Sequence, residues 1–359
     1  MKPWKLVTLC VVCLFGVSAV SAAEKDEDVL AEIAPLLAEG HFAVVRIDVA
    51  AVDLDAVIKE LDDALVKAGG DKLSTNTSYL DFKQRKADFT KAGGKALYVL
   101  MGEPTGQYMV ITMDKKNDPA ALAKVFEATL IKAGPAATEM NEQWQTVAKV
   151  HTGLLLLGMR RVVDNAVPAD PVARPDLAKA MAAAGDAPVA VAIVPPQKMV
   201  KMLVDQMPNL PEELGGGPTA PLGQIAWASI GVSPSKKTPV TVTVKCESAK
   251  AAKDLKTLLD TLLPAFDAMV TAEMERQQQR DLEQQGAISA GVRMSMSPWA
   301  LILMQGKELN LQARSDTVTG RMDEKGKAVV INRVANMVAK EQNLTKQHRA
   351  KAAEGLQQR

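Results

Sequence analysis

One order of apolar patterns occurs twice along the chain, and this repetition constrains the fold more than any other feature of the sequence. In the first half, a run with helical spacing ends at Gly40, and a run rich in β-branched residues follows at 42–47. In the second half, a similar helical run ends at Gly185 before a valine-rich run at 189–193. The later patterns also match in order, which predicts two similar units that each combine helices with a sheet.

Each half continues with a helix, a polar loop and a predicted hairpin. The first hairpin pairs 95–101 with 107–113 across a turn of glycines and a proline. The second hairpin pairs 224–232 with 239–246, where valine and threonine alternate as in a half-buried strand. In the first half, the polar stretch at 69–94 is expected to be a long loop that carries at most a short helix.

A second helix and closing strands complete each half. Asp118 followed by Pro119 is typical of a helix N-cap and first helical residue, and Ser248 is the corresponding cap in the second half. The closing strands are expected at 147–157 in the first half, and at 299–304 and 308–312 in the second. After Gly320, an apolar stripe predicts one long helix.

The order of elements in each half is β-α-β-β-α-β, with a helix in front. It resembles the ferredoxin-like split β-α-β motif, in which helices pack on one face of an antiparallel sheet. We therefore predict an α+β protein of two tandem ferredoxin-like units, at 24–172 and 173–320, followed by a helical tail at 321–359. Chance similarity between alanine-rich helices and valine-rich strands is the alternative explanation of the repetition.

The amino end has the three parts of a secretion signal. Lys2 and Lys5 form a short cationic start, and an uncharged apolar run at 6–20 is too short to span about 30 Å of hydrocarbon comfortably. Small residues follow, so cleavage is expected after Ala22 or Ala23, and residues 1–22 are predicted to be a signal peptide. The protein is then exported to the periplasm or the extracellular space, with no stable membrane span after cleavage.

Two alternatives apply to this end of the chain. The apolar run could remain as an anchor, because an acidic stretch follows it directly. Lipid attachment at Cys10 or Cys13 is disfavoured, because the bulky residues Leu9 and Val12 precede these cysteines. Both cysteines lie within the signal, so Cys246 is alone in the mature chain and no intrachain disulfide can form. The fold must then be stabilised by burial of apolar side chains, and hydrophobic residues make up 47% of the chain.

The composition argues against two classes of partner. The formal net charge is +1 and acids and bases are interspersed, so the chain lacks the basic footprint that nucleic acids require. Aromatic residues make up only 4%, which disfavours a stacking platform for sugars. The basic end of the predicted tail, which includes Lys340 and Lys346, is interpreted as solvated rather than as a site for an acidic partner or anionic lipid.

Histidine, the usual side chain for acid–base and metal chemistry at neutral pH, is rare in this chain. The three histidines are isolated from one another, at His41, His151 and His348. His41 precedes a predicted strand and His151 lies within one, where the fold could bring a carboxylate of the segment 48–55 beside them. The sequence has no His-Glu-x-x-His motif and no cysteine pair in the mature chain, so it lacks the usual zinc ligands. We predict a structural role for each histidine.

Three other motif-like segments have a simpler structural explanation. Ser233 and Lys236 satisfy a Ser-x-x-Lys spacing, but they lie between two predicted strands with a proline inside, which indicates a hairpin turn rather than a nucleophile. The segment 93–95, Gly-Gly-Lys, lacks the spacing of a phosphate-binding loop and is also predicted to be a turn. The glycine triplet that begins at Gly215 is predicted to be a flexible loop.

The sulfur-containing residues also have a simpler structural explanation than a functional one. Met294, Met296 and Met304 surround Trp299, and such thioethers can bind copper(I), but core packing explains them better because methionine is common throughout the chain. Cys246, at a strand end, is predicted to be a small buried residue. We therefore predict no catalytic, cofactor-binding or metal-ligating residue.

The run from Phe42 to Asp48 resembles one that often opens the mature part of uncharacterised exported proteins from planctomycete-type bacteria. This resemblance implies export and an α+β fold, and it supplies no activity. The leading hypothesis is an exported, non-catalytic binding or structural protein that contacts an unknown envelope protein. The alternatives are a carrier with an apolar cavity for a small apolar ligand or lipid, and a hydrolase with an unrecognised site.

Overall fold

The computed structural model describes residues 29–75, 77–104, 106–113, 117–131, 145–233, 239–283 and 306–357. The predicted signal peptide lies outside these ranges, as do the methionines around Trp299 with the strand predicted at 299–304, and the hairpin turn after Ser233. None of the helices in the described ranges has an apolar stretch of the length that a bilayer crossing requires.

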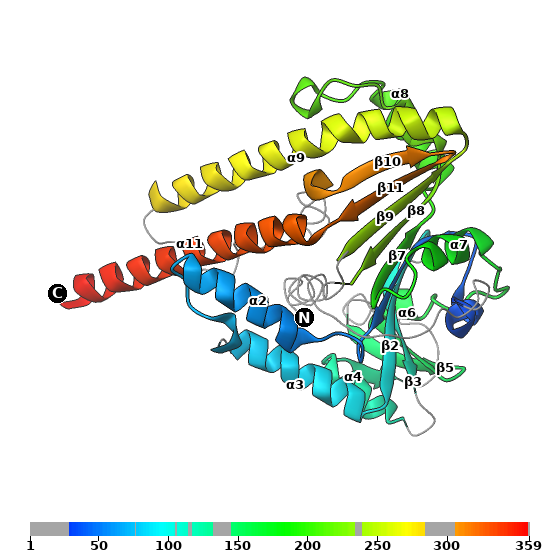
Figure 1. Cartoon of the computed structure of the whole chain (residues 1–359). Coiled ribbons are helices and arrows are strands. Elements are labelled where there is room, and N and C mark those ends of the chain that lie inside the picture. Colours follow the sequence, from blue (N-terminus) through cyan, green and yellow to red (C-terminus); the bar gives the residue numbers. More distant parts are fainter. Residues whose placement is uncertain are drawn as a thin grey trace.

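One sheet of eleven strands runs through the described molecule (Figure 1). Its strand order is β10-β11-β9-β8-β7-β1-β2-β3-β6-β5-β4. Neighbouring strands are antiparallel, except that β4 and β5 are parallel. The strands are β1 (His41–Asp48), β2 (Gly94–Gly102), β3 (Gly106–Met113), β4 (Thr129–Ile131), β5 (Thr146–His151), β6 (Leu154–Met159), β7 (Val189–Ile193), β8 (Ile225–Val232), β9 (Val240–Cys246), β10 (Asn310–Arg314) and β11 (Thr317–Met322).

Helices connect and cover these strands. The α-helices are α2 (Leu54–Lys67), α3 (Thr77–Lys91), α4 (Pro119–Val125), α6 (Arg160–Val163), α7 (Pro175–Ala183), α8 (Gln197–Gln206), α9 (Ala249–Glu283) and α11 (Glu324–Gln357). Short 3₁₀ turns are η1 (Ala31–Leu36), η2 (Leu73–Thr75), η3 (Glu212–Leu214), η4 (Ala220–Gln224) and η6 (Gly306–Glu308). The two predicted caps are confirmed, because Asp118 Oδ1 accepts from the Ala120 amide and Ser248 Oγ accepts from the Ala251 amide.

The two halves of the chain meet at the pair β1–β7. These strands are antiparallel, with Ala43 opposite Ile193 and Ile47 opposite Val189. From this junction the strands follow β1-β2-β3-β6-β5 outward on one side and β7-β8-β9-β11-β10 on the other. The same order of connections is therefore found on both sides of the junction, within a single sheet.

The α+β class is confirmed, whereas the arrangement in two ferredoxin-like sheets was wrong. A split β-α-β motif needs the two strands that flank a helix to run parallel, with another strand between them. Here β1 and β2 flank α2 and α3 yet are adjacent and antiparallel, and β7 and β8 are related in the same way around α8. Pairing of β1 with β7 also removes two open edges, which separate sheets would leave exposed.

Helices cover both faces of the first half of the sheet. On one face, Ile47 and Ile111 belong to a core closed by α2, α3 and α4. On the other face, Val44 and Val110 belong to a core closed by η1, α6 and α7. The expectation that helices occupy one face was therefore wrong for this half. It failed because these strands carry apolar side chains on both faces.

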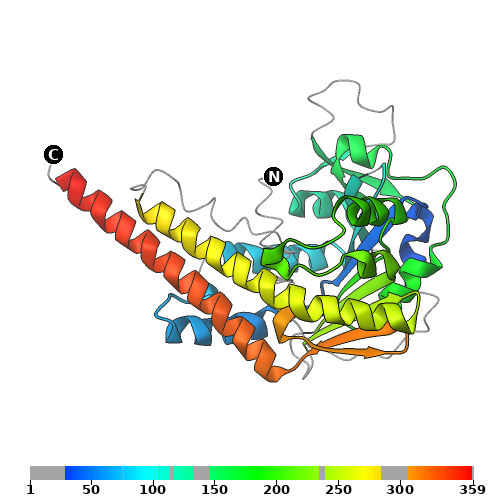
Figure 2. The ribbon, with the colours of Figure 1, turned by 90° about the horizontal axis from the view of Figure 1, so that it is seen from above.

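In the second half, α9 packs on β9, β10 and β11, and Leu255 of α9 shares a small core with Val244 and Val318. The long helix predicted after Gly320 is confirmed as α11, which leaves β11 and packs on α2. Both α9 and α11 extend beyond the sheet on the same side (Figure 2). Lys346 on α11 is exposed, as the prediction of a solvated basic tail requires, and its ammonium lies 2.8 Å from a carboxylate oxygen of the exposed Asp71.

Two segments differ from their predicted structure. The stretch expected to be a long loop contains α3, where Tyr79 and Phe89 are buried against the sheet. Three aromatic residues at helical spacing give this otherwise polar helix an apolar side, and Lys83 and Arg85 bond to residues outside it. The strand expected at 147–157 is a hairpin, β5 and β6. Its turn has positive φ at Thr152 and Gly153, a conformation that the glycine adopts without strain.

Candidate functional site

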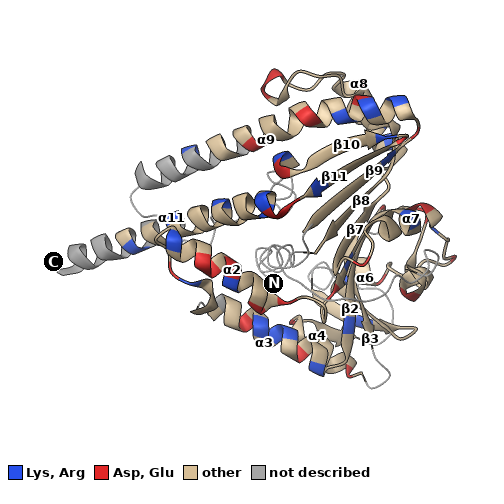
Figure 3. Ribbon diagram, in the orientation of Figure 1, with Lys and Arg blue, Asp and Glu red and all other residues tan. Residues whose placement is uncertain are grey.

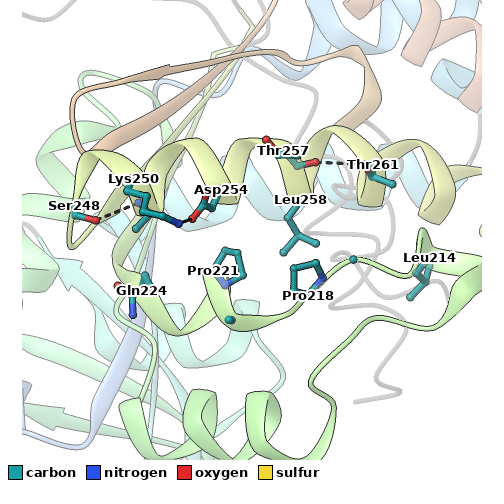
Figure 4. A pocket seen from close by; sticks show the side chains of 13 residues that line it. Leu214, Pro218, Pro221, Gln224, Ser248, Lys250, Asp254, Thr257, Leu258 and Thr261 are labelled. Carbon is teal, nitrogen blue, oxygen red and sulfur yellow. Dashed lines mark hydrogen bonds and ion pairs between the residues drawn. The ribbon is translucent and has the colours of Figure 1, made fainter.

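A groove of about 580 Å³ lies between α9 and the segment that leads from α8 into β8 (Figure 4). One wall is the side of α9 from Lys250 to Thr261. The opposite wall is built by the residues from Leu214 to Gln224, which include η4. We call this site the α9 groove.

The α9 wall presents polar side chains at helical spacing. Lys250 and Asp254 form an ion pair with an N–O distance of 2.5 Å, and Thr257 and Thr261 follow on the same side of the helix. The Thr257 hydroxyl donates to the Lys253 carbonyl and the Thr261 hydroxyl to the Thr257 carbonyl. These hydroxyls retain their acceptor lone pairs, so the wall can receive hydrogen bonds from an occupant.

The opposite wall is apolar and is held in place by one buried threonine. The Thr219 side chain is fully buried, and its hydroxyl donates to the Met207 carbonyl at 2.5 Å. Its amide donates to the Pro208 carbonyl at 2.9 Å, which closes the loop between Met207 and Thr219. Because both ends of the loop are bonded to each other, Pro218 and Pro221 face α9 from a fixed backbone.

The glycine triplet that begins at Gly215 brings the loop backbone close to α9. Gly215 has φ +97°, and a Cβ built there would lie 2.3 Å from Cγ2 of Thr261. At Gly217, a Cβ would lie 3.3 Å from the Leu258 side chain. Glycine is needed because the loop backbone contacts α9 directly and closes one end of the groove.

The groove combines apolar contact area with a few polar groups, which is the usual composition of a ligand-binding site. Leu258, Pro218 and Pro221 contribute apolar surface. Lys250 and Asp254 balance each other's charge, and the Ser248 hydroxyl is engaged as the cap of α9. The chemistry of the site is therefore suited to holding a neutral, largely apolar segment.

The predicted histidines do not contribute to this groove. His41 is only 2% exposed, its Nδ1 accepts from the Ala38 amide at 2.9 Å, and its Nε2 lies 3.3 Å from the Tyr108 hydroxyl. Arg174 donates to the Glu39 and His41 carbonyls beside it. Burial, together with the positive charge of Arg174, lowers the pKa of His41. These contacts give His41 a structural role in fixing the start of β1.

The carboxylates of the segment 48–55 are engaged elsewhere. Asp48 accepts from the Ala51 amide, and Asp53 caps α2. Asp55 pairs with Lys83 and accepts from the Tyr79 hydroxyl, and these bonds lower the pKa of its carboxyl group. The fold therefore brings His41 to Tyr108 and Arg174 rather than to these acids.

The remaining candidate residues take structural positions. His151 ends β5, and His348 lies on α11, where its side chain is outside the description. Gly93 has φ +86° and precedes β2, as a turn residue does. Cys246 is buried, as predicted, and burial raises the pKa of its thiol. In the described ranges, no group of three His, Cys, Asp or Glu side chains is placed to hold a metal ion.

Sequence reasoning missed the groove. Its walls belong to segments about 30 residues apart that the sequence shows as a loop and the start of a helix. One signal was present: Pro208, Pro211, Pro218 and Pro221 around a glycine triplet mark an ordered loop of restricted backbone rather than a flexible linker.

No family model matches the chain, and no curated protein matches it at a significant level. Among solved structures, the chain is similar to the one described as "Structure of crystal form I of TP0453". The two chains share 10% identity at a TM-score of 0.30, over 84% of this chain and 96% of the other. A similarity of this size supports no inference about fold or function.

Proposed function

We propose that the protein is an exported, non-catalytic binding protein of the bacterial cell envelope, and that the α9 groove receives an extended segment of a partner protein. The groove itself is the observation that carries this proposal, because an apolar wall faces a wall of regularly spaced polar groups. Export and kinship with planctomycete-type proteins are part of the proposal and rest on the amino end and on the run Phe42–Asp48.

Binding fits the groove better than hydrolysis does. A hydroxyl nucleophile needs a base within hydrogen-bond distance that can take its proton. In the groove, Ser248 caps α9 and the two threonine hydroxyls donate to backbone carbonyls. The ionisable pair, Lys250 and Asp254, is bonded to itself. Such groups fix the position of an occupant rather than activate a bond in it.

An extended segment fits better than a small apolar ligand. The groove is only partly enclosed, whereas carriers of small apolar molecules enclose most of the ligand surface. From Lys250 to Thr261 the α9 wall is about 16 Å long at 1.5 Å per residue. This length matches about five residues of extended chain at about 3.3 Å each. A carrier of small apolar molecules remains the second candidate, because the opposite wall is apolar.

The proposal is tested with the full chain, produced in an exporting host and screened against a displayed library of random 12-residue peptides. We expect enrichment of peptides with apolar residues and at least a tenfold weaker binding of these peptides by Thr257→Trp, whose indole would fill the groove. Lys253→Trp is the matched control, because Lys253 is also exposed on α9 but does not line the groove.

Two results would overturn the proposal. Equal peptide binding by Thr257→Trp and the wild type would place the binding elsewhere on the molecule. Tight binding of a fluorescent fatty acid by the wild type and its loss in Thr257→Trp, without peptide enrichment, would establish the carrier instead. Circular dichroism and urea unfolding of both variants show that they are folded.

A further inference from the structure

Helix α8 carries an exposed apolar surface that no described element covers. Met199, Met202 and Leu203 are 45%, 50% and 41% exposed, and none of the ten residues of α8 is buried. Residues three and four apart lie on one side of a helix, so these three side chains form a continuous patch. We call this patch the Met face.

The opposite edge of α8 explains why the helix is ordered although it buries no residue fully. Val200 and Val204 are half-buried, and Val204 Cγ2 lies 3.8 Å from the position of a Cβ built on Gly223 in η4. Contacts between α8 and η4 hold the helix by this edge. An amphipathic helix of this kind has an apolar arc wide enough to pack on two neighbours, and among the described elements its main contact is with η4.

We propose that the Met face is a docking site for an amphipathic helix of a partner protein that carries acidic residues beside its own apolar stripe. This inference rests on the proposed function and names the chemistry of a second contact with the partner. Methionine suits such a contact, because its flexible and polarizable side chain adapts to apolar partners of varied shape. Helix-in-groove recognition uses the same spacing of apolar residues at i, i+3 and i+4.

The charged residues beside the Met face indicate the sign of the charge that the partner carries there. Lys198 and Lys201 are both exposed, and neither has an ion-pair partner among the described residues. Lys198 lies one helical turn before Met202, so its ammonium borders the Met face. A glutamate or aspartate next to the apolar stripe of a partner helix would meet these ammonium groups as the apolar surfaces come together.

The surroundings of the Met face favour a protein helix over an anionic lipid surface. Asp205 of α8 is exposed, and Glu212 and Glu213 are exposed in the loop that follows. Acidic and basic residues are also interspersed along the rest of the described ribbon (Figure 3). A broad anionic membrane would meet all these carboxylates at once. A single helix contacts only the side of α8 where Lys198 and Lys201 outnumber Asp205, which lies one helical turn after Lys201.

The Met face and the α9 groove are linked through one short element. Residues of η4 line the groove, and η4 contacts both α8 and α9. A partner that enters the groove with an extended segment can therefore reach α8 with a helix close by in its sequence. Two linked contacts strengthen binding without requiring either contact to be tight.

The test uses two synthetic 14-residue amphipathic peptides that share a leucine stripe and differ in their flanking residues, glutamate in one and lysine in the other. Fluorescence anisotropy with the full chain is expected to show at least tenfold tighter binding of the glutamate peptide. Met202→Glu should weaken this binding at least tenfold. The double substitution Lys198→Glu and Lys201→Glu should reverse the preference. Leu80→Glu is the matched control, because Leu80 is 51% exposed on α3, outside the Met face.

Equal binding of the two peptides, or equal losses in Met202→Glu and Leu80→Glu, would overturn the inference. Sedimentation with phosphatidylglycerol vesicles but not with phosphatidylcholine vesicles, lost in Met202→Glu, would replace the protein partner with a lipid surface. Thr257→Trp separates this inference from the proposed function. It should keep full affinity for the glutamate peptide, so failure of the groove and failure of the Met face are seen in different variants.

Discussion

The guanidinium of Arg333 on α11 donates to Oδ1 of Asp267 on α9 at 2.5 Å. Asp267 is 6% exposed, and its other carboxylate oxygen lies 2.6 Å from the ammonium of Lys307 in η6. The single carboxylate thus bonds two cations that lie 40 and 66 residues further along the chain. It ties the helix that forms one wall of the groove to the carboxyl-terminal helix.

We expect Arg333→Met to destabilise the protein by about 2 kcal/mol, because Asp267 would keep only one of its two cationic partners in a buried position. The measurement is the free energy of unfolding in urea. Asp254→Asn removes a partner of the exposed pair with Lys250 and is expected to change stability by less than about 1 kcal/mol. Equal effects of the two substitutions would mean that burial does not strengthen the Asp267 pair.

His41 predicts a specific pH dependence of stability. Burial and then the charge of Arg174 lower its pKa in the folded protein, so the unfolded chain takes up the proton more readily. The folded state should therefore lose stability as the pH falls below about 6.5, the unperturbed value of histidine. Urea unfolding at pH 7.5 and pH 5.5 measures this loss, and His41→Asn should reduce it.

Because Gly215 lies close to Thr261, a side chain at position 215 should clash with Thr261, and a smaller residue at position 261 should relieve the clash. Gly215→Ala should destabilise the protein by about 2 kcal/mol or more, because the new Cβ meets Thr261 Cγ2 and the backbone has positive φ. Gly216→Ala shares the positive φ but meets no atom within 4 Å, so it should cost only about 1 kcal/mol. Adding Thr261→Ser to Gly215→Ala removes the clashing methyl group and should recover the difference. Without recovery, the assigned contact would be wrong.

The amino end gives a prediction that mass spectrometry decides. When the full chain is produced in an exporting bacterium, the intact mass of the product should correspond to a start at Ala23 or Glu24, after removal of the signal peptide. A mass that retains Met1 would identify an anchored protein instead. An added lipid on a chain that begins at Cys10 or Cys13 would identify a lipoprotein.

Local patterns predicted most helices and strands correctly. Alternating valine and threonine in β9, the Asp118 and Ser248 caps, and the apolar stripe of α11 each depend on neighbours within about seven residues, so the sequence displays them directly. The prediction failed at α3, because only three aromatic residues stand among mostly polar ones and the apolar stripe is weak. It also failed for the hairpin of β5 and β6, where one glycine changes the direction of the chain.

The sequence by itself determined the α+β class, the buried Cys246 and the order of elements, because burial of a periodic apolar face is a local requirement. The tertiary structure alone decided three things. Strands β1 and β7 join the halves into one sheet, Thr219 and Gly215 hold a loop against α9 to form the groove, and no described element covers the Met face of α8. Each of these features depends on contacts between segments that are distant in sequence, and no local pattern encodes which segments pair. Many strands and helices offer equally apolar surfaces, so only their simultaneous packing selects one arrangement.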